Sequence, residues 1–63
     1  MELTVTIQMD NAAFDDHPQV EVAAILRDLT ARVEAYAHLA PGVDLSLYDS
    51  NGNWVGNAIV TGA

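Results

Sequence analysis

The chain of 63 residues contains no cysteine and no lysine, and its only basic side chains are Arg27 and Arg32. Without cysteine it can form neither a disulfide framework nor a thiolate metal site. Nine acidic residues against two basic ones give a formal net charge of −7. Two arginines cannot assemble a patch that neutralises DNA or RNA phosphates, so we expect no direct nucleic-acid binding, and any charged partner should be basic.

Long apolar runs are also missing from the chain. No stretch approaches the roughly 20 apolar residues that a membrane-spanning helix needs. Residues 1–9 lack the basic start and continuous apolar segment of a secretion signal. These features favour a cytoplasmic protein with no membrane attachment. A chain of this length predicts a single domain, 1–63, because it has too little material for a second core.

No motif in the sequence indicates a reaction. His17 and His38 are the only imidazoles, and the predicted helix places them at its opposite ends, about 30 Å apart. Ser46 and Ser50 have no base nearby in the sequence. We therefore expect a non-enzymatic protein that holds no cofactor and no metal.

The segment DSNGN, residues 49–53, places oxygen-bearing side chains at every second position, as calcium loops do. Such loops also need Gly at the sixth position and Glu at the twelfth, which here are Trp54 and Val60. Asn-Gly between two strand-like runs is instead typical of a two-residue type I′ hairpin turn. We predict such a turn centred on Asn51 and Gly52.

Three strands and one helix are predicted from periodicity. Residues 2–9 alternate polar and apolar, and 43–49 and 54–60 are strand-like around the turn. Residues 10–18 predict an ordered connection that Phe14 anchors to the core. Residues 17–39 have a helical period, with a capping box from Asp16 to Gln19 and a stop at Pro41 and Gly42. Asp28 and Arg32 are placed to pair across one turn of this helix.

These elements predict an α+β fold of the order β-α-β-β. We expect a three-stranded antiparallel sheet with strand order 1-3-2 and one helix packed on one face. The turn length sets the hairpin register, which pairs Leu45 with Ala58, Leu47 with Gly56 and Tyr48 with Val55. In this register Trp54 faces the core.

Two kinds of surface are candidates for binding a partner. The first is acidic, and its carboxylates serve either for solubility alone or as contacts to a basic surface. It comprises Asp10, Asp15, Asp16, Glu21 and Asp28. The second is apolar and lies on the outward faces of the helix and sheet. It comprises Val20, Ala24, Ala31, Tyr48 and Val55, and it suits either a homodimer or another protein contact.

Three stretches of the chain, DNAAF, VAAILRDLTARVE and LYDSNGNWVG, resemble very small acidic proteins encoded by bacteriophages and prophages. Within that set the chain is similar to anti-CRISPR inhibitors of type I-C Cascade. The resemblance covers nearly the whole chain, and its motifs are turn and cap signals. It implies a DNA mimic that blocks PAM recognition at the basic DNA-reading surface of the Cas8-type subunit of Cascade, inside the bacterial host cell. The alternative is a structural or regulatory phage protein that acts through homodimerisation or protein contact.

Overall fold

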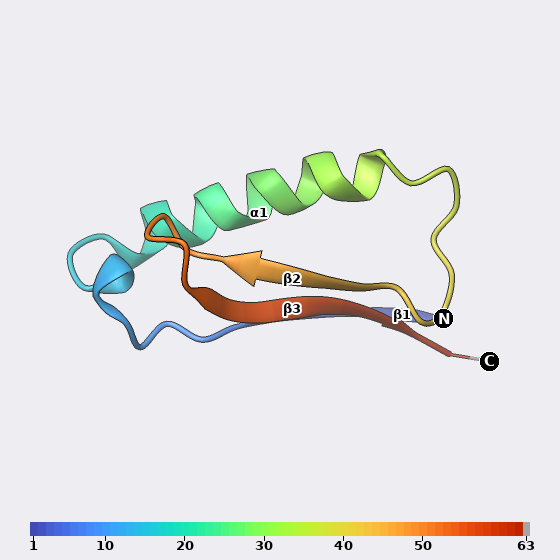
Figure 1. Cartoon of the computed structure of the whole chain (residues 1–63), viewed down its shortest axis with the longest axis horizontal. Helices are drawn as coiled ribbons and strands as arrows, with labels where there is room; N and C mark the ends of the chain where they lie inside the picture. The colour runs from blue at the N-terminus through green and yellow to red at the C-terminus, as the bar shows by residue number, and fades with distance from the viewer. Residues whose placement is uncertain (63) are drawn as a thin grey trace.

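The strands and helices follow the order that the sequence predicts. The computed structural model describes residues 1–62 (Figure 1). Its elements are β1 (Glu2–Ile7), η1 (Ala12–Phe14), α1 (Pro18–Glu34), β2 (Asp44–Tyr48) and β3 (Trp54–Thr61). The strands form one sheet in the order β1-β3-β2, and β3 is antiparallel to both neighbours. The predicted α+β fold and strand order are therefore confirmed.

The core lies between α1 and the sheet, with the short η1 helix, a 3₁₀ turn, closing one end (Figure 1). Each buried aliphatic side chain contributes about 1.5–3 kcal/mol relative to an exposed one. The buried cluster consists of Phe14, Ile25, Leu29, Leu47, Val55 and Ala58. Phe14 is 4% exposed, which confirms its predicted role as the anchor of the connection between β1 and α1.

The hairpin between β2 and β3 differs from the predicted two-residue turn. The N–H of Gly52 donates to the carbonyl of Asp49 (3.0 Å), and the N–H of Asp49 donates to the carbonyl of Asn53 (2.9 Å). Gly52 has a φ of 82°, whereas no residue other than glycine has a positive φ in residues 1–62. A type I′ turn requires positive φ at both central residues, so that prediction is wrong. The hairpin loop is Ser50–Asn51–Gly52, a type I turn followed by a glycine bulge.

A second irregularity changes which side chain of β3 reaches the core. Leu45 pairs with Ala58 and Leu47 with Gly56, as predicted, but Tyr48 pairs with Trp54, so that Val55 is the extra residue of a β-bulge. Val55 is 2% exposed and Trp54 is 52% exposed. The prediction placed Trp54 in the core and Val55 on the surface, and it is wrong for both, because the two side chains have exchanged places. Val55 is in the core and is unavailable as a surface contact.

The helix is shorter than predicted and starts without the predicted cap. His17 is the N-cap residue, Pro18 is the first helical residue, and the cap position makes no side-chain hydrogen bond, so the capping box from Asp16 is wrong. The helix ends at Glu34, close to Val33, the last helical side chain that packs on the core. Because packing supplies most of the stability of a short helix, the helix does not continue to residue 39, beyond the last side chain that packs. Within residues 1–62, no helix is both long and apolar enough to cross a membrane.

Candidate protein-binding site

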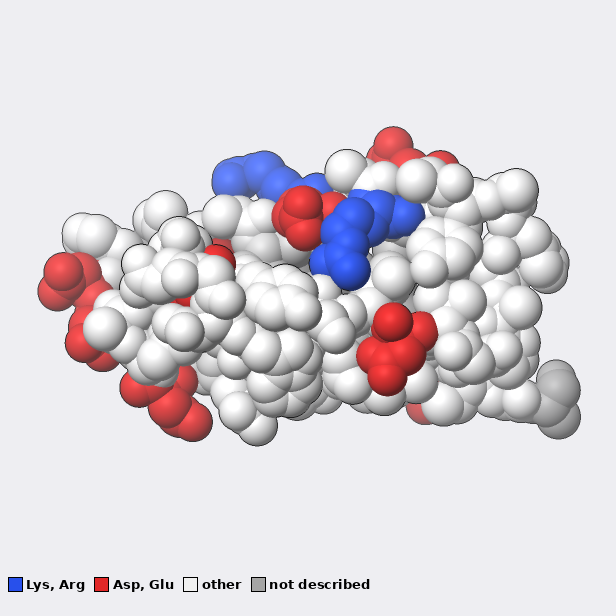
Figure 2. Space-filling view, viewed as in Figure 1, with Lys and Arg blue, Asp and Glu red and all other residues white. Residues whose placement is uncertain are grey.

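Three of the predicted acidic contact residues lie together at one end of the molecule. Asp10, Asp15 and Asp16 are exposed and belong to residues 8–17, which join β1 to α1 and are called the acidic connection below. Figure 2 shows carboxylates gathered at the end where this segment lies, and others set apart along the molecule. In the described chain these three side chains make no hydrogen bond or ion pair with another residue. Their charges are therefore available to a partner.

The acidic connection is held in place by two residues between its aspartates. Phe14 is buried in the core, and its N–H donates to the carbonyl of Asn11 (3.1 Å) within η1. The side-chain Nδ2 of Asn11 donates to Oδ2 of Asp49 at 2.7 Å, which ties the connection to the hairpin loop. Because the segment is already ordered, little conformational entropy remains to be lost when a partner binds.

Asp49 is the acceptor that joins these two loops. It is 6% exposed, and its Oδ1 accepts hydrogen bonds from the N–H groups of Asn51 and Asn53, both at 2.9 Å. Burial acts to raise the pKa of Asp49, but the bonds from Asn53, Asn11 and Asn51 outweigh it, so the pKa lies below its usual value of 3.8. The alternating Asp and Asn residues thus cap their own turn.

The lowered pKa predicts that Asp49 stabilises the fold only while it is ionised. This stabilisation is present above pH 3.8, the ordinary value, and is lost as the pH falls through the lower pKa of the folded state. We expect Asp49→Asn to be less stable than the wild type at pH 7 in urea unfolding. The difference in the free energy of unfolding between the two proteins should close as the pH falls below 3.8.

A matched control for this prediction is the exposed Asp44 of β2. Asp44→Asn should stay within about 0.5 kcal/mol of the wild type, as surface substitutions do. A gap for Asp49→Asn that is unchanged between pH 7 and pH 2 would contradict the assigned role of the charge.

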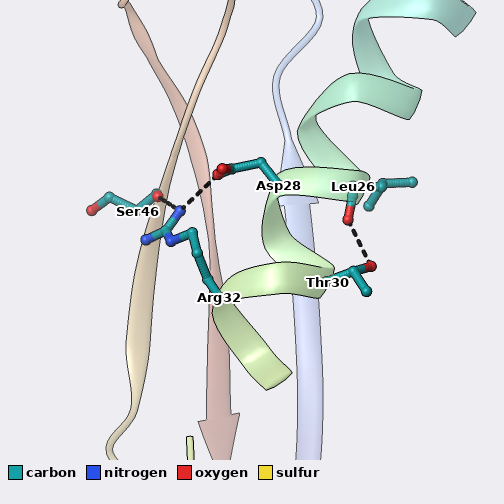
Figure 3. A network of polar contacts seen from close by, with 5 residues as sticks. All are labelled: Leu26, Asp28, Thr30, Arg32 and Ser46. Carbon is teal, nitrogen blue, oxygen red and sulfur yellow. Dashed lines mark hydrogen bonds and ion pairs between the residues drawn. The ribbon is translucent and has the colours of Figure 1, made fainter. Parts of the chain in front are cut away.

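The other two predicted acidic contacts are already used within the molecule. Both oxygens of Glu21 accept hydrogen bonds from Ser50, one from its N–H (3.1 Å) and one from its hydroxyl (2.7 Å). Asp28 forms the predicted ion pair with Arg32, with Oδ2 to Nη1 at 3.6 Å (Figure 3). Such a pair between solvent-accessible side chains is worth about 0–1 kcal/mol. Glu21 and Asp28 are therefore less free than the three aspartates of the acidic connection.

A shallow groove between α1 and the β2–β3 hairpin nevertheless brings several predicted residues together. Its chemistry suits a cationic side chain, because carboxylates lie beside apolar surface and a tyrosine ring, over which a guanidinium or ammonium group can pack. The groove is lined by Glu21, Ala24, Ile25, Asp28, Tyr48, Asp49 and Ser50.

The predicted apolar contacts are in part exposed. Val20 is 61% exposed and Tyr48 is 55% exposed, and Ala24 and Ala31 are also exposed on α1. These four can contact a partner, but they do not form one continuous surface with Val55, which is buried.

Sequence reasoning missed the polar contacts that build the site. Asn11 and Asp49 are 38 residues apart and Glu21 and Ser50 are 29 apart, so no local pattern indicates either pair. The Asp and Asn residues around Gly52 did indicate a turn, but the prediction did not include its closure by the side chain of Asp49.

Comparison of the chain with protein-family models, with curated proteins and with solved structures finds no match.

Proposed function

We propose that this chain is a non-enzymatic inhibitor that occupies the basic DNA-reading surface of a CRISPR effector, with its carboxylates standing in for DNA phosphates. Following the resemblance of the sequence, the target is the Cas8-type subunit of type I-C Cascade, in the cytoplasm of a bacterial host. The observation that carries the proposal is the acidic connection, in which three unpaired aspartates are held by Phe14 and by the bond from Asn11 to Asp49.

The physical basis is competition for a cationic surface. An effector that reads a PAM holds duplex DNA through a positively charged surface, and phosphate contacts supply much of its affinity. Each carboxylate of the acidic connection can accept a charge-assisted hydrogen bond from Lys or Arg, which is roughly twice as strong as a neutral one. The net charge of −7 also favours encounter with a basic partner and makes association fall as salt rises.

The groove lies on the same side of the molecule as the start of α1 and offers a second contact. Glu21 and Asp28 keep lone pairs beyond those used by Ser50 and Arg32. An arginine or lysine of the partner can place its alkyl chain on Ala24 and Tyr48 and its charge between the two carboxylates. The acidic connection then supplies charge and the groove supplies orientation.

The test is inhibition of DNA binding by purified type I-C Cascade. Fluorescence anisotropy would follow a labelled duplex with the PAM while the chain is titrated. We expect Asp15→Asn with Asp16→Asn to raise the half-inhibitory concentration at least tenfold, which corresponds to about 1.4 kcal/mol. The loss of two charge-assisted hydrogen bonds is large enough to account for this change.

A control double variant removes the same charge elsewhere. Glu34→Gln with Asp44→Asn alters two exposed carboxylates outside the acidic connection and should change inhibition by about twofold or less, by screened long-range charge alone. Equal losses in the two double variants would show that net charge acts without a defined site. If the wild type leaves DNA binding by Cascade unchanged, the proposed target is wrong.

A further inference from the structure

β1 and β2 are the two edge strands of the sheet, and they differ in whether their outward backbone groups have a hydrogen-bond partner. The N–H of Val60 in β3 donates to the carbonyl of Val43, the residue before β2. The alternation of an antiparallel ladder therefore points the backbone groups of residues 44, 46 and 48 of β2 toward the open edge. Arg32 covers this edge, because its Nη1 donates to the carbonyl of Ser46 at 2.7 Å (Figure 3). The bulge at Val55 makes the pairing of β2 with β3 irregular, and a bulge increases the local twist of an edge.

The edge formed by β1 is open. Gln8 donates its N–H to the carbonyl of Val55 at 2.7 Å, so even-numbered residues of β1 bond to β3, and the backbone groups of Leu3, Val5 and Ile7 point outward. Pairing with β3 runs without a bulge from Glu2 to Ile7. Residues 3–7 contain no charge and no proline, which are the usual means of protecting an edge.

The side chains of these three residues lie on the helix side of the sheet, where Ile7 packs on the core but Leu3 and Val5 are poorly covered. Leu3 and Val5 pair with Val60 and Ala58, which are buried, yet they remain 46% and 39% exposed. The reason is that α1 packs toward β2. Figure 3 shows Leu26 on the flank of α1 opposite to Asp28 and Arg32, and it too is 42% exposed.

From this edge we propose that the chain forms a homodimer by antiparallel pairing of β1 with β1 of a second copy. With Val5 on the two-fold axis, Val5 pairs with Val5 and Leu3 pairs with Ile7 of the second copy. All the outward backbone groups of these residues then find partners, and the apolar side chains meet on one face of a six-stranded sheet. A two-fold interface requires this self-complementarity.

The charge distribution fits a second copy in this orientation. Glu2 is the only charged residue of β1, and it comes opposite Gln8 of the other copy. The acidic connection follows the C-terminal end of β1, so antiparallel pairing puts the two connections at opposite ends of the interface. They are separated by about 20 Å of strand, at least twice the Debye length of about 8–10 Å. Parallel pairing would bring them together.

Cross-linking tests both the dimer and its register, because the chain has no cysteine of its own. In a hydrogen-bonded antiparallel pair the Cα atoms are about 5.5 Å apart, within the range for a disulfide. We expect Val5→Cys to form a covalent dimer under mild oxidation. Leu3→Cys is the matched control, because its side chain is similarly exposed but would lie about 14 Å from its own counterpart.

Solution mass supplies the second measurement. Analytical ultracentrifugation of the wild type should give twice the chain mass of 6.7 kDa, and Val5→Lys should give the monomer with an unchanged circular dichroism spectrum. Thr4→Lys, on the other face of the sheet, should remain dimeric. A monomeric wild type at millimolar concentration would overturn the proposal, as would equal cross-linking of the two cysteine variants. If Val5→Lys fails to fold, cross-linking decides alone.

Discussion

Replacement of Gly56 by alanine should remove most of the stability of the fold. A Cβ atom at this position would lie 1.8 Å from the carbonyl oxygen of Thr6 and 2.8 Å from its carbonyl carbon. Both are backbone atoms of β1, so no side chain can move to relieve the clash. We expect a loss of about 3 kcal/mol or more, against a total of roughly 3–5 kcal/mol for a domain of this size. Urea unfolding followed by circular dichroism measures the loss.

Gly42 provides the control for this substitution. It has a φ of 99°, but a Cβ atom there would meet nothing within 4 Å. Gly42→Ala therefore tests backbone strain alone, which costs about 1–2 kcal/mol. If Gly56→Ala is as stable as Gly42→Ala, β1 and β3 do not approach as closely as described.

The second large effect is expected at Val55, where the bulge turns the side chain into the core. An aspartate there would bury a carboxylate without a partner, at a cost of several kcal/mol. We expect Val55→Asp to be unfolded at pH 7 and to regain helix and sheet signal in circular dichroism at acidic pH, where the carboxylate is neutral.

The neighbouring Trp54 is the matched control, because it is in the same strand and 52% exposed. Trp54→Asp keeps the new charge in water and loses only the cross-strand pair with Tyr48, worth about 0.2–1 kcal/mol. It should remain folded at pH 7. The opposite outcome, with Trp54→Asp unfolded and Val55→Asp folded, would support the regular register without a bulge.

These two residues also show how far the sequence alone could predict the hairpin. The alternation in residues 54–60 indicates a strand, and Asn51-Gly52 indicates a turn, and both elements are present. A single extra residue reverses which neighbour faces the core, because side chains alternate with a period of two. The bulge depends on the three-residue loop and on how β3 packs between two strands, so no local pattern specified it.

The candidate site was likewise predicted only in part from the sequence. Its charge was evident from the sequence, and so was the anchoring role of Phe14. Which carboxylates are free was not evident, because it depends on Ser50 reaching Glu21 and Asn11 reaching Asp49 from distant parts of the chain.

The sequence by itself determined the strands, the helix, the strand order and the acidic character of the protein, because periodicity, connection rules and charge depend on neighbouring residues and composition. Only the tertiary structure decided the position of α1 over the sheet. That position places Arg32 on the edge of β2 and leaves Leu3 and Val5 of β1 exposed. The docking of a helix on a sheet is set by the packing of all the core side chains together, which no single segment contains.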